Sequence, residues 1–338
     1  IMNKVRIGVV GLGRLGFTHA ENIHFHTKNT NLVAVCSHSL EELTKAKKKL
    51  GVTNCFKSIR EMISGIKLDA VVLVSPSKYH AEQSSYCLQE GLHVFCEKPL
   101  ATTIEACKEV EKEVIKRPFQ IFMLGFMRRY DPSYLYAKKC IDAGKIGRPI
   151  LYRGYSVDPN SSIEGALKYA AQSSGQFIDM AVHDFDLARW FLKAEPTSIY
   201  AIGGCYLHEE YKQFEDGDNV SALLKFENDA MAFIFAGRTA AHGYNVETEI
   251  VGTKATLRIG SVPQKNLVEI LDINGVKKEC SQSFNERFET AFRNEIQEFV
   301  DCILEKRQPE IKAHDGTRAS YIAEMATKSF KNNSLIEL

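Results

Sequence analysis

The chain has no long hydrophobic run and no block of like charge. Its longest apolar runs, such as residues 70–74, have the length of a strand and are far shorter than the roughly 20 residues that cross a bilayer. Lysine and arginine (43) nearly balance aspartate and glutamate (42). Because basic clusters are what bind anionic surfaces, we expect neither a nucleic acid nor a membrane as a partner.

Paired cysteine motifs are also missing. Nine cysteines are scattered over 338 residues, and none belongs to a C-x-x-C pair. An odd, unpatterned set is typical of reduced thiols, so we expect a cytoplasmic protein. The sequence has no H-E-x-x-H motif and no Cys/His cluster, so we expect no metal site.

The order of strand-like and helical segments indicates an α/β protein with two domains. Residues 4–124 alternate short Val- and Ile-rich runs with helical stretches, which favours a doubly wound parallel sheet of the Rossmann type. Beyond Gly125, two helical segments frame a strand, closely spaced strands follow, and two helices close the chain. This pattern favours an α+β domain with a largely antiparallel open sheet. The predicted domains are 1–124 and 125–338.

A glycine-rich turn follows the first expected strand and opens a helix. It reads Gly11-Leu-Gly13-Arg14-Leu15-Gly16. Such glycines allow a tight turn and let the backbone approach a pyrophosphate at the helix N-terminus. In this context the motif predicts a dinucleotide-binding domain over 1–124, with these residues at the cofactor.

The usual acidic partner of this motif, about 20 residues further on, is not found at the end of the second strand. Ser37 and His38 stand there instead, and Arg14 is within reach of the same place. A carboxylate at this position would repel the 2′-phosphate of NADP. Because the sequence has none there, NAD and NADP both stay open as cofactors.

Three further segments carry candidate site residues. Ser75-Pro76 and Glu97-Lys98 follow two strands at the edge where open α/β sheets bind ligands. A lysine that ends a buried strand needs a cleft or a partner, so Lys98 is either structural or catalytic. Arg129, after the last strand of the Rossmann part, lines a cleft or forms a salt bridge at the domain junction.

Asp179 and His183 are spaced i, i+4, which puts both side chains on one helix face. The pair is compatible with a hydrogen bond that orients a core histidine, with two ligands of a metal site, or with acid–base catalysis. No nearby Cys/His cluster completes a set of four ligands, which disfavours the metal.

Together, the glycine-rich turn, Glu97-Lys98-Pro99 and Asp179-x-x-x-His183 resemble the glucose-fructose oxidoreductase / inositol dehydrogenase / MocA-like family. The segments 125–134, 147–149 and 242–244 are most similar to its inositol 2-dehydrogenase branch. The resemblance implies that Lys98, Asp179 and His183 form the catalytic set. His183 would be the general base, Lys98 would stabilise the reacting oxygen, and Asp179 would orient the imidazole or bind a neighbouring hydroxyl.

The same resemblance implies a substrate site and an activity. Arg129 and Tyr244 would contact the polyol, as would Ser156 and Asp158, where several inositol enzymes have histidine and asparagine. We expect an NAD(P)-dependent dehydrogenase that oxidises a ring hydroxyl of myo- or scyllo-inositol or a similar cyclic polyol. The alternatives are an aldose or deoxysugar dehydrogenase and a non-catalytic sugar or dinucleotide sensor. Domain 125–338 would bind the substrate and form a homo-oligomer, with a tetramer suspected.

Overall fold

The computed structural model describes residues 4–170, 175–260 and 264–338, and these form two compact units. The first unit comprises 1–130 with 290–318, and the second comprises 131–289 with 319–338. Within the described residues, none of the helices combines the length and the hydropathy that a bilayer span requires.

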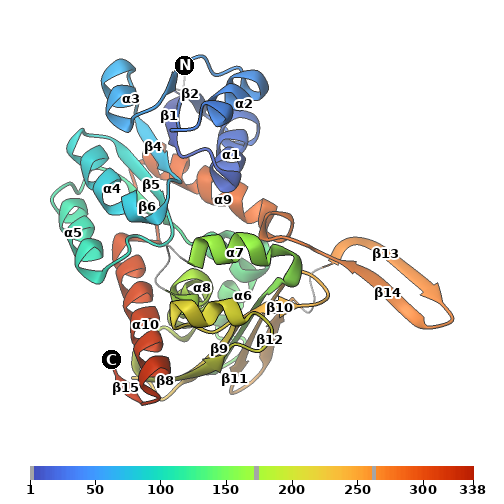
Figure 1. The fold of residues 1–338 in the computed structure, drawn as a ribbon. Helices are drawn as coiled ribbons and strands as arrows, with labels where there is room; N and C mark the ends of the chain where they lie inside the picture. Colours follow the sequence, from blue (N-terminus) through green and yellow to red (C-terminus); the bar gives the residue numbers. More distant parts are fainter. Residues whose placement is uncertain (1–3, 171–174, 261–263) are drawn as a thin grey trace. The chain divides into compact units, whose positions relative to one another are not determined.

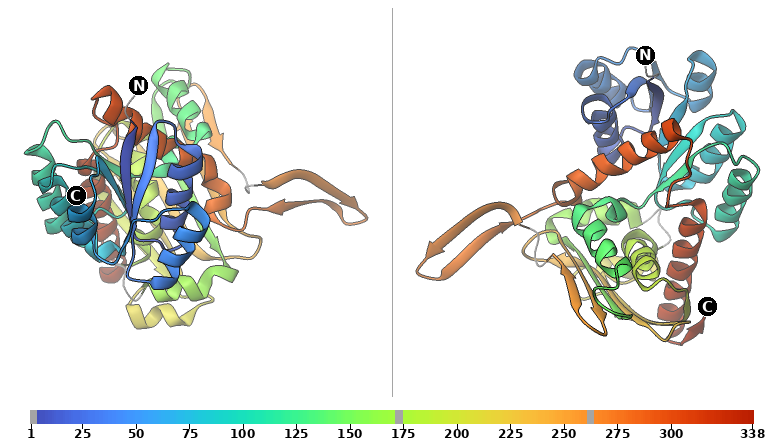
Figure 2. Two further views of the ribbon diagram at one scale, coloured as in Figure 1. Left: turned by 90° about the horizontal axis from the view of Figure 1, so that it is seen from above. Right: turned by 180° about the vertical axis from the view of Figure 1, so that it is seen from behind.

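The first unit is built on a six-stranded parallel sheet (Figure 1). The strand order is β3-β2-β1-β4-β5-β6. The chain runs from β1 to one edge of the sheet and then returns to β4 and runs to the other edge, so the sheet is doubly wound. Helices α1 and α2 lie on one side of the sheet, and α4 and α5 lie on the other (Figure 2). This confirms the predicted Rossmann sheet. Its elements are β1 (Val5–Val10), α1 (Arg14–Glu21), η1 (Asn22–His26), β2 (Thr30–Cys36), α2 (Leu40–Leu50), β3 (Cys55–Phe56), α3 (Ile59–Gly65), β4 (Ala70–Leu73), η2 (Ser77–Tyr79), α4 (His80–Gln89), β5 (His93–Glu97), α5 (Ile104–Ile115), β6 (Phe122–Gly125) and η3 (Met127–Tyr130).

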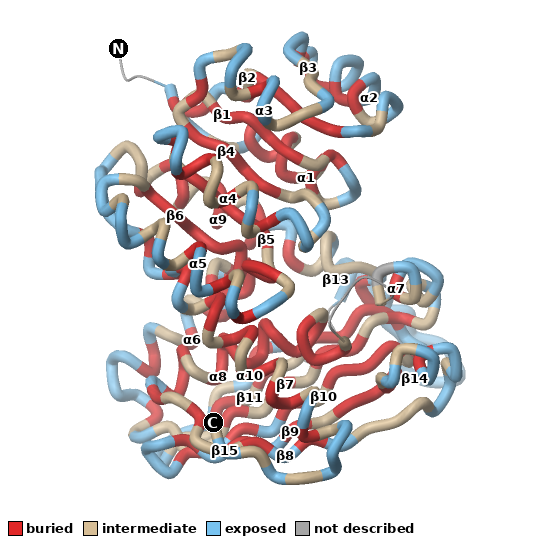
Figure 3. Tube along the Cα trace, turned by 60° about the vertical axis from the view of Figure 1, so that its left-hand side comes forward, coloured by how far each residue is buried: buried red, intermediate tan, exposed pale blue. Residues whose placement is uncertain are grey.

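The core of this unit is continuous across the sheet. Strands β1, β4 and β5 are buried along almost their whole length, as parallel strands covered on both faces must be (Figure 3). Ile7, Val9 and Phe95 of these strands share one apolar cluster with Ile296 and Phe299. The last two lie on α9 (Phe284–Glu305), near the end of the chain.

The share of α9 in this core is a difference from the predicted domain organisation. The sequence analysis placed everything after residue 124 in one domain. In the structure, 290–318 group with the first unit because the apolar face of α9 completes its core. The helical pattern of α9 was visible in the sequence, but the sheet that it covers already ends at Gly125, long before α9 begins at Phe284.

The second unit holds a seven-stranded mixed sheet in the order β12-β11-β7-β10-β9-β8-β15. Every strand pair is antiparallel except β7 with β10. The largely antiparallel sheet is thus confirmed, but its strands do not follow the order of the chain, because β7 lies between β10 and β11. Its elements are α6 (Pro132–Asp142), β7 (Pro149–Pro159), η4 (Asn160–Ser162), α7 (Ile163–Ala170), η5 (Phe177–Ala181), α8 (Val182–Leu192), β8 (Pro196–Gly204), η6 (Glu209–Phe214), β9 (Asn219–Phe226), β10 (Met231–Ala240), β11 (Asn245–Gly252), β12 (Thr256–Ile259), β15 (Ile336–Glu337) and α10 (Ala313–Asn332) from residue 319 onward.

One face of this sheet packs on helices, and the other stays open. Tyr152 of β7 and Phe191 of α8 stack with ring centroids 6.3 Å apart. On the opposite face, large apolar side chains of β8, β9 and β10 are exposed. Strands β13 (Gln264–Asp272) and β14 (Gly275–Cys280) form a separate hairpin that stands away from the sheet as an arm (Figure 2).

Candidate active site

The glycine-rich turn between β1 and α1 has the shape of a pyrophosphate cradle. Gly11 has a φ of +88°, and a Cβ there would lie 2.6 Å from the Val74 carbonyl oxygen. A Cβ on Gly16 would lie 1.9 Å from the Gly11 carbonyl oxygen, so only glycine fits at either place. By contrast, a Cβ on Gly13 would meet nothing within 4 Å. The open space at Gly13 is at the helix N-cap, where backbone N–H groups are available for phosphate oxygens.

The other predicted cofactor residues of this turn lie at the start of α1. Arg14 is exposed, and Leu15 is half-buried. The turn is tied to the end of β2, because the Gly11 N–H donates to the Cys36 carbonyl at 2.9 Å. Ser37 follows there and is buried, whereas His38 is exposed.

A carboxylate does stand at the end of β2, but it comes from the next helix. The Ser37 hydroxyl donates to Oε2 of Glu42 at 2.5 Å, and it accepts the Ser39 backbone N–H at 3.1 Å. The inference from sequence that no acid occupies this position is therefore wrong. Ser39 caps α2 and accepts the Glu42 N–H, a capping arrangement that turns the glutamate toward the helix start. The S-x-x-E spacing was the signal for this placement.

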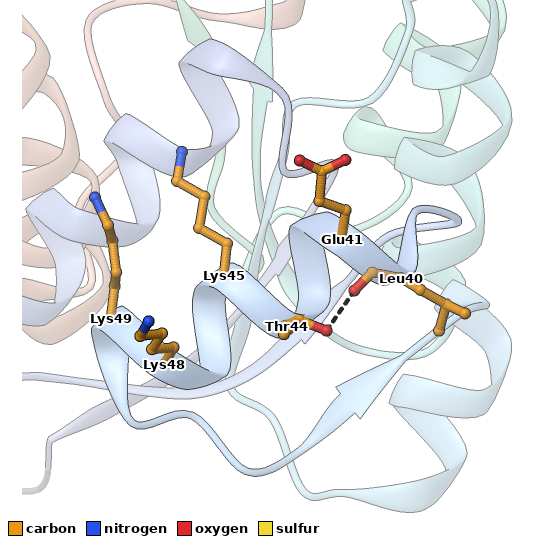
Figure 4. A pocket seen from close by; sticks show the side chains of 6 residues that line it. All are labelled: Leu40, Glu41, Thr44, Lys45, Lys48 and Lys49. Carbon is orange, nitrogen blue, oxygen red and sulfur yellow. Dashed lines mark hydrogen bonds between the residues drawn. The ribbon is translucent and has the colours of Figure 1, made fainter.

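A hollow along the outer side of α2 is lined by one exposed helix face and contains none of the predicted site residues. Two of its lysines extend toward α1, with Lys45 Nζ 4.0 Å and Lys49 Nζ 5.9 Å from the centre of the Phe17 ring (Figure 4). The lining residues are Leu40, Glu41, Thr44, Lys45, Lys48 and Lys49.

The carboxyl ends of β4 and β5 hold the next predicted residues. Ser75 is half-buried and donates its hydroxyl to Gln83 Oε1 at 2.6 Å, whereas Pro76 is exposed. Lys98 is half-buried and directly follows Glu97, whose carboxylate accepts the Lys98 backbone N–H at 3.2 Å. The structure thus brings these residues to neighbouring turns at one sheet edge, as the sequence predicts.

Glu97 belongs to a buried cluster that the sequence analysis missed. His19 Nε2 donates to Glu97 Oε1 at 2.7 Å, and Glu295 Oε1 lies 3.8 Å from the same nitrogen. Burial, and then the neighbouring Glu97 carboxylate, raise the pKa of Glu295 well above its usual range. The three residue types are those of a metal site, but the His19–Glu97 distance is that of a direct hydrogen bond. Their separation in sequence hid this arrangement.

In the second unit, Asp179 lies in the π-helical turn η5 and His183 lies in the first turn of α8. Asp179 is partly exposed, and His183 is nearly buried. Arg238 of β10 is 6% exposed and donates to the carboxylates of both Asp179 and Asp158. Burial lowers the pKa of Arg238, but the two carboxylates outweigh this and raise it, so the guanidinium stays charged. Sequence analysis missed Arg238, although a charged residue in a buried strand is a signal of its own.

The remaining predicted residues are buried and have structural partners. Ser156 is 0% exposed and donates to Asp184 Oδ2 at 2.7 Å, which joins β7 to α8. Tyr244 is buried and makes an edge-to-face contact with Phe288, with centroids 6.3 Å apart.

Arg129, which belongs to the first unit, is buried as well. It forms an ion pair with Asp315 of the same unit at 3.3 Å, so this salt bridge lies within one unit and is not the one that the sequence analysis considered at the domain junction.

Both halves of the chain match one protein family, and full-length relatives exist. The relatives include the scyllo-inositol 2-dehydrogenase (NAD(+)) of Bacillus subtilis, 32% identical over 99% of this chain and 97% of that protein. The myo-inositol 2-dehydrogenase of Thermotoga maritima is 31% identical, with 99% and 98% covered. A solved structure of scyllo-inositol dehydrogenase from Lactobacillus casei, with bound NAD(H) and scyllo-inositol, is 41% identical with a TM-score of 0.95 over 99% of both chains.

The matches to the family cover most of the chain. Residues 5–126 match the oxidoreductase family with an NAD-binding Rossmann fold, and residues 134–258 match the GFO/IDH/MocA C-terminal domain. The chain therefore belongs to the GFO/IDH/MocA family of NAD-binding oxidoreductases.

Proposed function

We propose that this protein oxidises a secondary ring hydroxyl of an inositol to the ketone and uses NAD as the hydride acceptor. The observation that carries the proposal is the full-length similarity to the Lactobacillus casei dehydrogenase, whose structure contains NAD(H) and scyllo-inositol. The glycine cradle supports it independently, because Gly13 leaves open space where a pyrophosphate would lie. Bound nicotinamide would supply the hydride-accepting carbon.

The proton-transfer roles follow from the chemistry of three side chains. His183 takes the hydroxyl proton as general base, and Lys98 donates a hydrogen bond to the same oxygen as negative charge develops on it. Asp179 binds a neighbouring hydroxyl or orients the imidazole. Its ion pair with Arg238 supports an ionised carboxylate, which accepts hydrogen bonds only.

Further polar groups would contact the polyol. Asp158 carries a partly exposed carboxylate, and Arg129 and Tyr244 would contribute to the walls of the site. Ser156 would act indirectly, because its hydroxyl is bonded to Asp184. We propose that Asp158 influences the choice between myo- and scyllo-inositol.

We also propose a preference for NAD over NADP. Glu42, bonded to Ser37 at the end of β2, would face the ribose of the adenosine half, which binds at the end of this strand in Rossmann domains. A carboxylate there accepts hydrogen bonds from ribose hydroxyls and repels a 2′-phosphate. Ser75, Pro76 and the Glu97-Lys98 segment would approach the nicotinamide half.

The test is spectrophotometric. Purified protein is assayed with each inositol isomer and with a set of pyranoses, using NAD and NADP in parallel at neutral to alkaline pH. We expect NADH formation with myo- or scyllo-inositol. Reduction of NAD or NADP with pyranoses but with no inositol would indicate an aldose dehydrogenase. No reduction of either cofactor with any substrate would indicate a sensor.

We further propose a homo-oligomer that covers the open face of the second unit's sheet. An exposed apolar face of this kind marks a protein interface. Light scattering after size exclusion should give the mass of a tetramer, and Phe233→Glu should reduce it. The exposed side chains are Tyr200, Ile202, Leu223, Met231 and Phe233.

A cytoplasmic location would suit the nine cysteines, all of them free thiols.

A further inference from the structure

His80 is buried near the carboxyl ends of β4 and β5 and has no role in the mechanism proposed above. His80 is the first residue of α4 and is 2% exposed. Its Nδ1 lies 2.7 Å from the Pro99 carbonyl oxygen, and its Nε2 lies 2.7 Å from the Ser75 carbonyl oxygen. The ring therefore bridges two turns that the sequence separates by 24 positions.

These two contacts fix the protonation state of the ring. A carbonyl oxygen only accepts hydrogen bonds, so each ring nitrogen must carry a hydrogen. In either neutral tautomer, one nitrogen lone pair would face a carbonyl lone pair at 2.7 Å. The geometry thus requires an imidazolium.

His93, on β5, has the opposite protonation state. Its Nδ1 accepts the Ile121 backbone N–H at 2.9 Å, so this nitrogen carries no hydrogen and the ring is neutral. Burial lowers the pKa of His93, which agrees with this geometry. The two histidines provide an internal comparison.

The surroundings of His80 stabilise its charge. Burial by itself lowers the pKa of His80, but Cys96 of β5 and the two carbonyl groups outweigh it and raise the pKa to about 9. Cys96 is the titratable group that faces the ring, and Cys87 of α4 in turn faces Cys96. Burial raises the pKa of Cys87 to a value that keeps it a neutral thiol at neutral pH.

The two bridged turns are those that carry proposed site residues. Ser75 precedes Pro76 and closely approaches the glycine turn, because a Cβ on Gly11 would lie 2.7 Å from the Ser75 nitrogen. Pro99 directly follows Lys98. A movement of either turn would therefore displace the cofactor cradle or the lysine.

We propose that His80 is a positioning residue, held as a buried imidazolium that ties the Ser75 turn to the Lys98-Pro99 turn. Cofactor affinity and turnover then depend on its proton. The effect on turnover rests on the proposed dehydrogenase function, but the charge state and the effect on dinucleotide binding do not.

The first experiment measures the charge directly in the full-length protein. Ring nitrogens are labelled with ¹⁵N, and the His80 and His93 signals are assigned by their loss in His80→Gln and His93→Gln. We expect both His80 nitrogens to be protonated at pH 7 with a midpoint near 9, and His93 to be a neutral tautomer with a protonated Nε2. A neutral His80 ring at pH 7 would overturn the proposal.

The second experiment separates positioning from a merely structural role. NADH binding is followed by fluorescence, and kcat and KM for NAD are measured between pH 6.5 and 10. Wild type should bind more weakly as the pH rises through about 9. His80→Gln, which can donate to only one carbonyl, should be weakened already at pH 7, with kcat/KM lower on the order of 10- to 100-fold. It should also lack the alkaline decline.

His93→Gln is the matched control, because glutamine keeps an acceptor for the Ile121 N–H. It should retain wild-type NADH affinity and the wild-type pH profile. If His80→Gln lowers only the melting temperature and keeps the wild-type NADH affinity and pH profile, the positioning role is wrong. If that variant does not fold, the alkaline decline of wild-type NADH binding still decides. The NADH and NMR results are independent of which substrate is oxidised.

Discussion

The ion pairs of Arg238 give the most quantitative test of the second unit. Arg238→Met keeps much of the side-chain volume but removes the charge that faces Asp158 and Asp179. Two carboxylates then face each other beside a buried strand. Removing one partner of a buried ion pair typically costs about 3–5 kcal/mol. For a unit of this size, we expect the melting temperature to fall by roughly 6–20 °C.

The pH dependence of this loss has a definite sign. Without Arg238, the two carboxylates repel each other in the folded state when both are ionised, and a proton bound by either one relieves this repulsion. The folded variant then binds more protons, so its stability falls as the pH rises above about 4. The difference between the melting temperatures of wild type and variant should be small near pH 4 and largest near pH 7.

Thermal and urea unfolding of the full chain measure this effect, and two further variants serve as controls. Arg153→Met removes an ion pair at 3.5 Å to Glu249, but Arg153 is 36% exposed, so we expect little change. Adding Asp158→Asn and Asp179→Asn to Arg238→Met should recover most of the loss. An equal loss in the Arg153 and Arg238 variants, or a loss that does not depend on pH, would refute the reasoning.

Three other predictions concern the first unit. Lys98→Ala should lower kcat by orders of magnitude and leave NADH binding largely intact; near-normal turnover would contradict the proposed role. Gly13→Ala should weaken NADH binding at an unchanged melting temperature because its Cβ meets only open space, whereas Gly16→Ala should lower both because of a 1.9 Å clash. Glu295→Gln should stabilise the protein increasingly as the pH rises from about 4.5, because the raised pKa of Glu295 makes wild type lose stability over that range. A pH-independent difference in melting temperature would show that Glu295 does not hold a proton.

Much of the first unit was predictable because its signals are local. The Val- and Ile-rich runs identified its longer strands, and the glycine spacing identified the cradle before any distance was known. Strand β3, with two residues, is too short for such a signal. Most strands of the second unit were also visible, but their order was not. The insertion of β7 between β10 and β11 depends on pairings distant in sequence, which no local pattern encodes.

The same reason explains which site residues were missed. Arg238 is separated by 59 positions from Asp179, and Glu97 by 78 from His19, so neither contact follows from a motif. Glu42 is different, since it lies only five positions from Ser37. Its capping pattern was recognisable, but the pattern was not connected with the cofactor. Motifs identified residue types with chemical roles, and the structure supplied their partners.

The contribution of α9 to the Rossmann core has a consequence for synthesis of the chain. Ile296, Phe299 and Val300 complete the apolar cluster of the sheet, yet they leave the ribosome after the whole segment 131–289. Until then, the apolar surface beside Phe95 lacks its cover. The dinucleotide-binding unit, although it begins the chain, therefore becomes complete only when translation is almost finished. A nascent chain that ends at residue 283 should remain sensitive to protease in its first 130 residues, whereas the full chain should be resistant there.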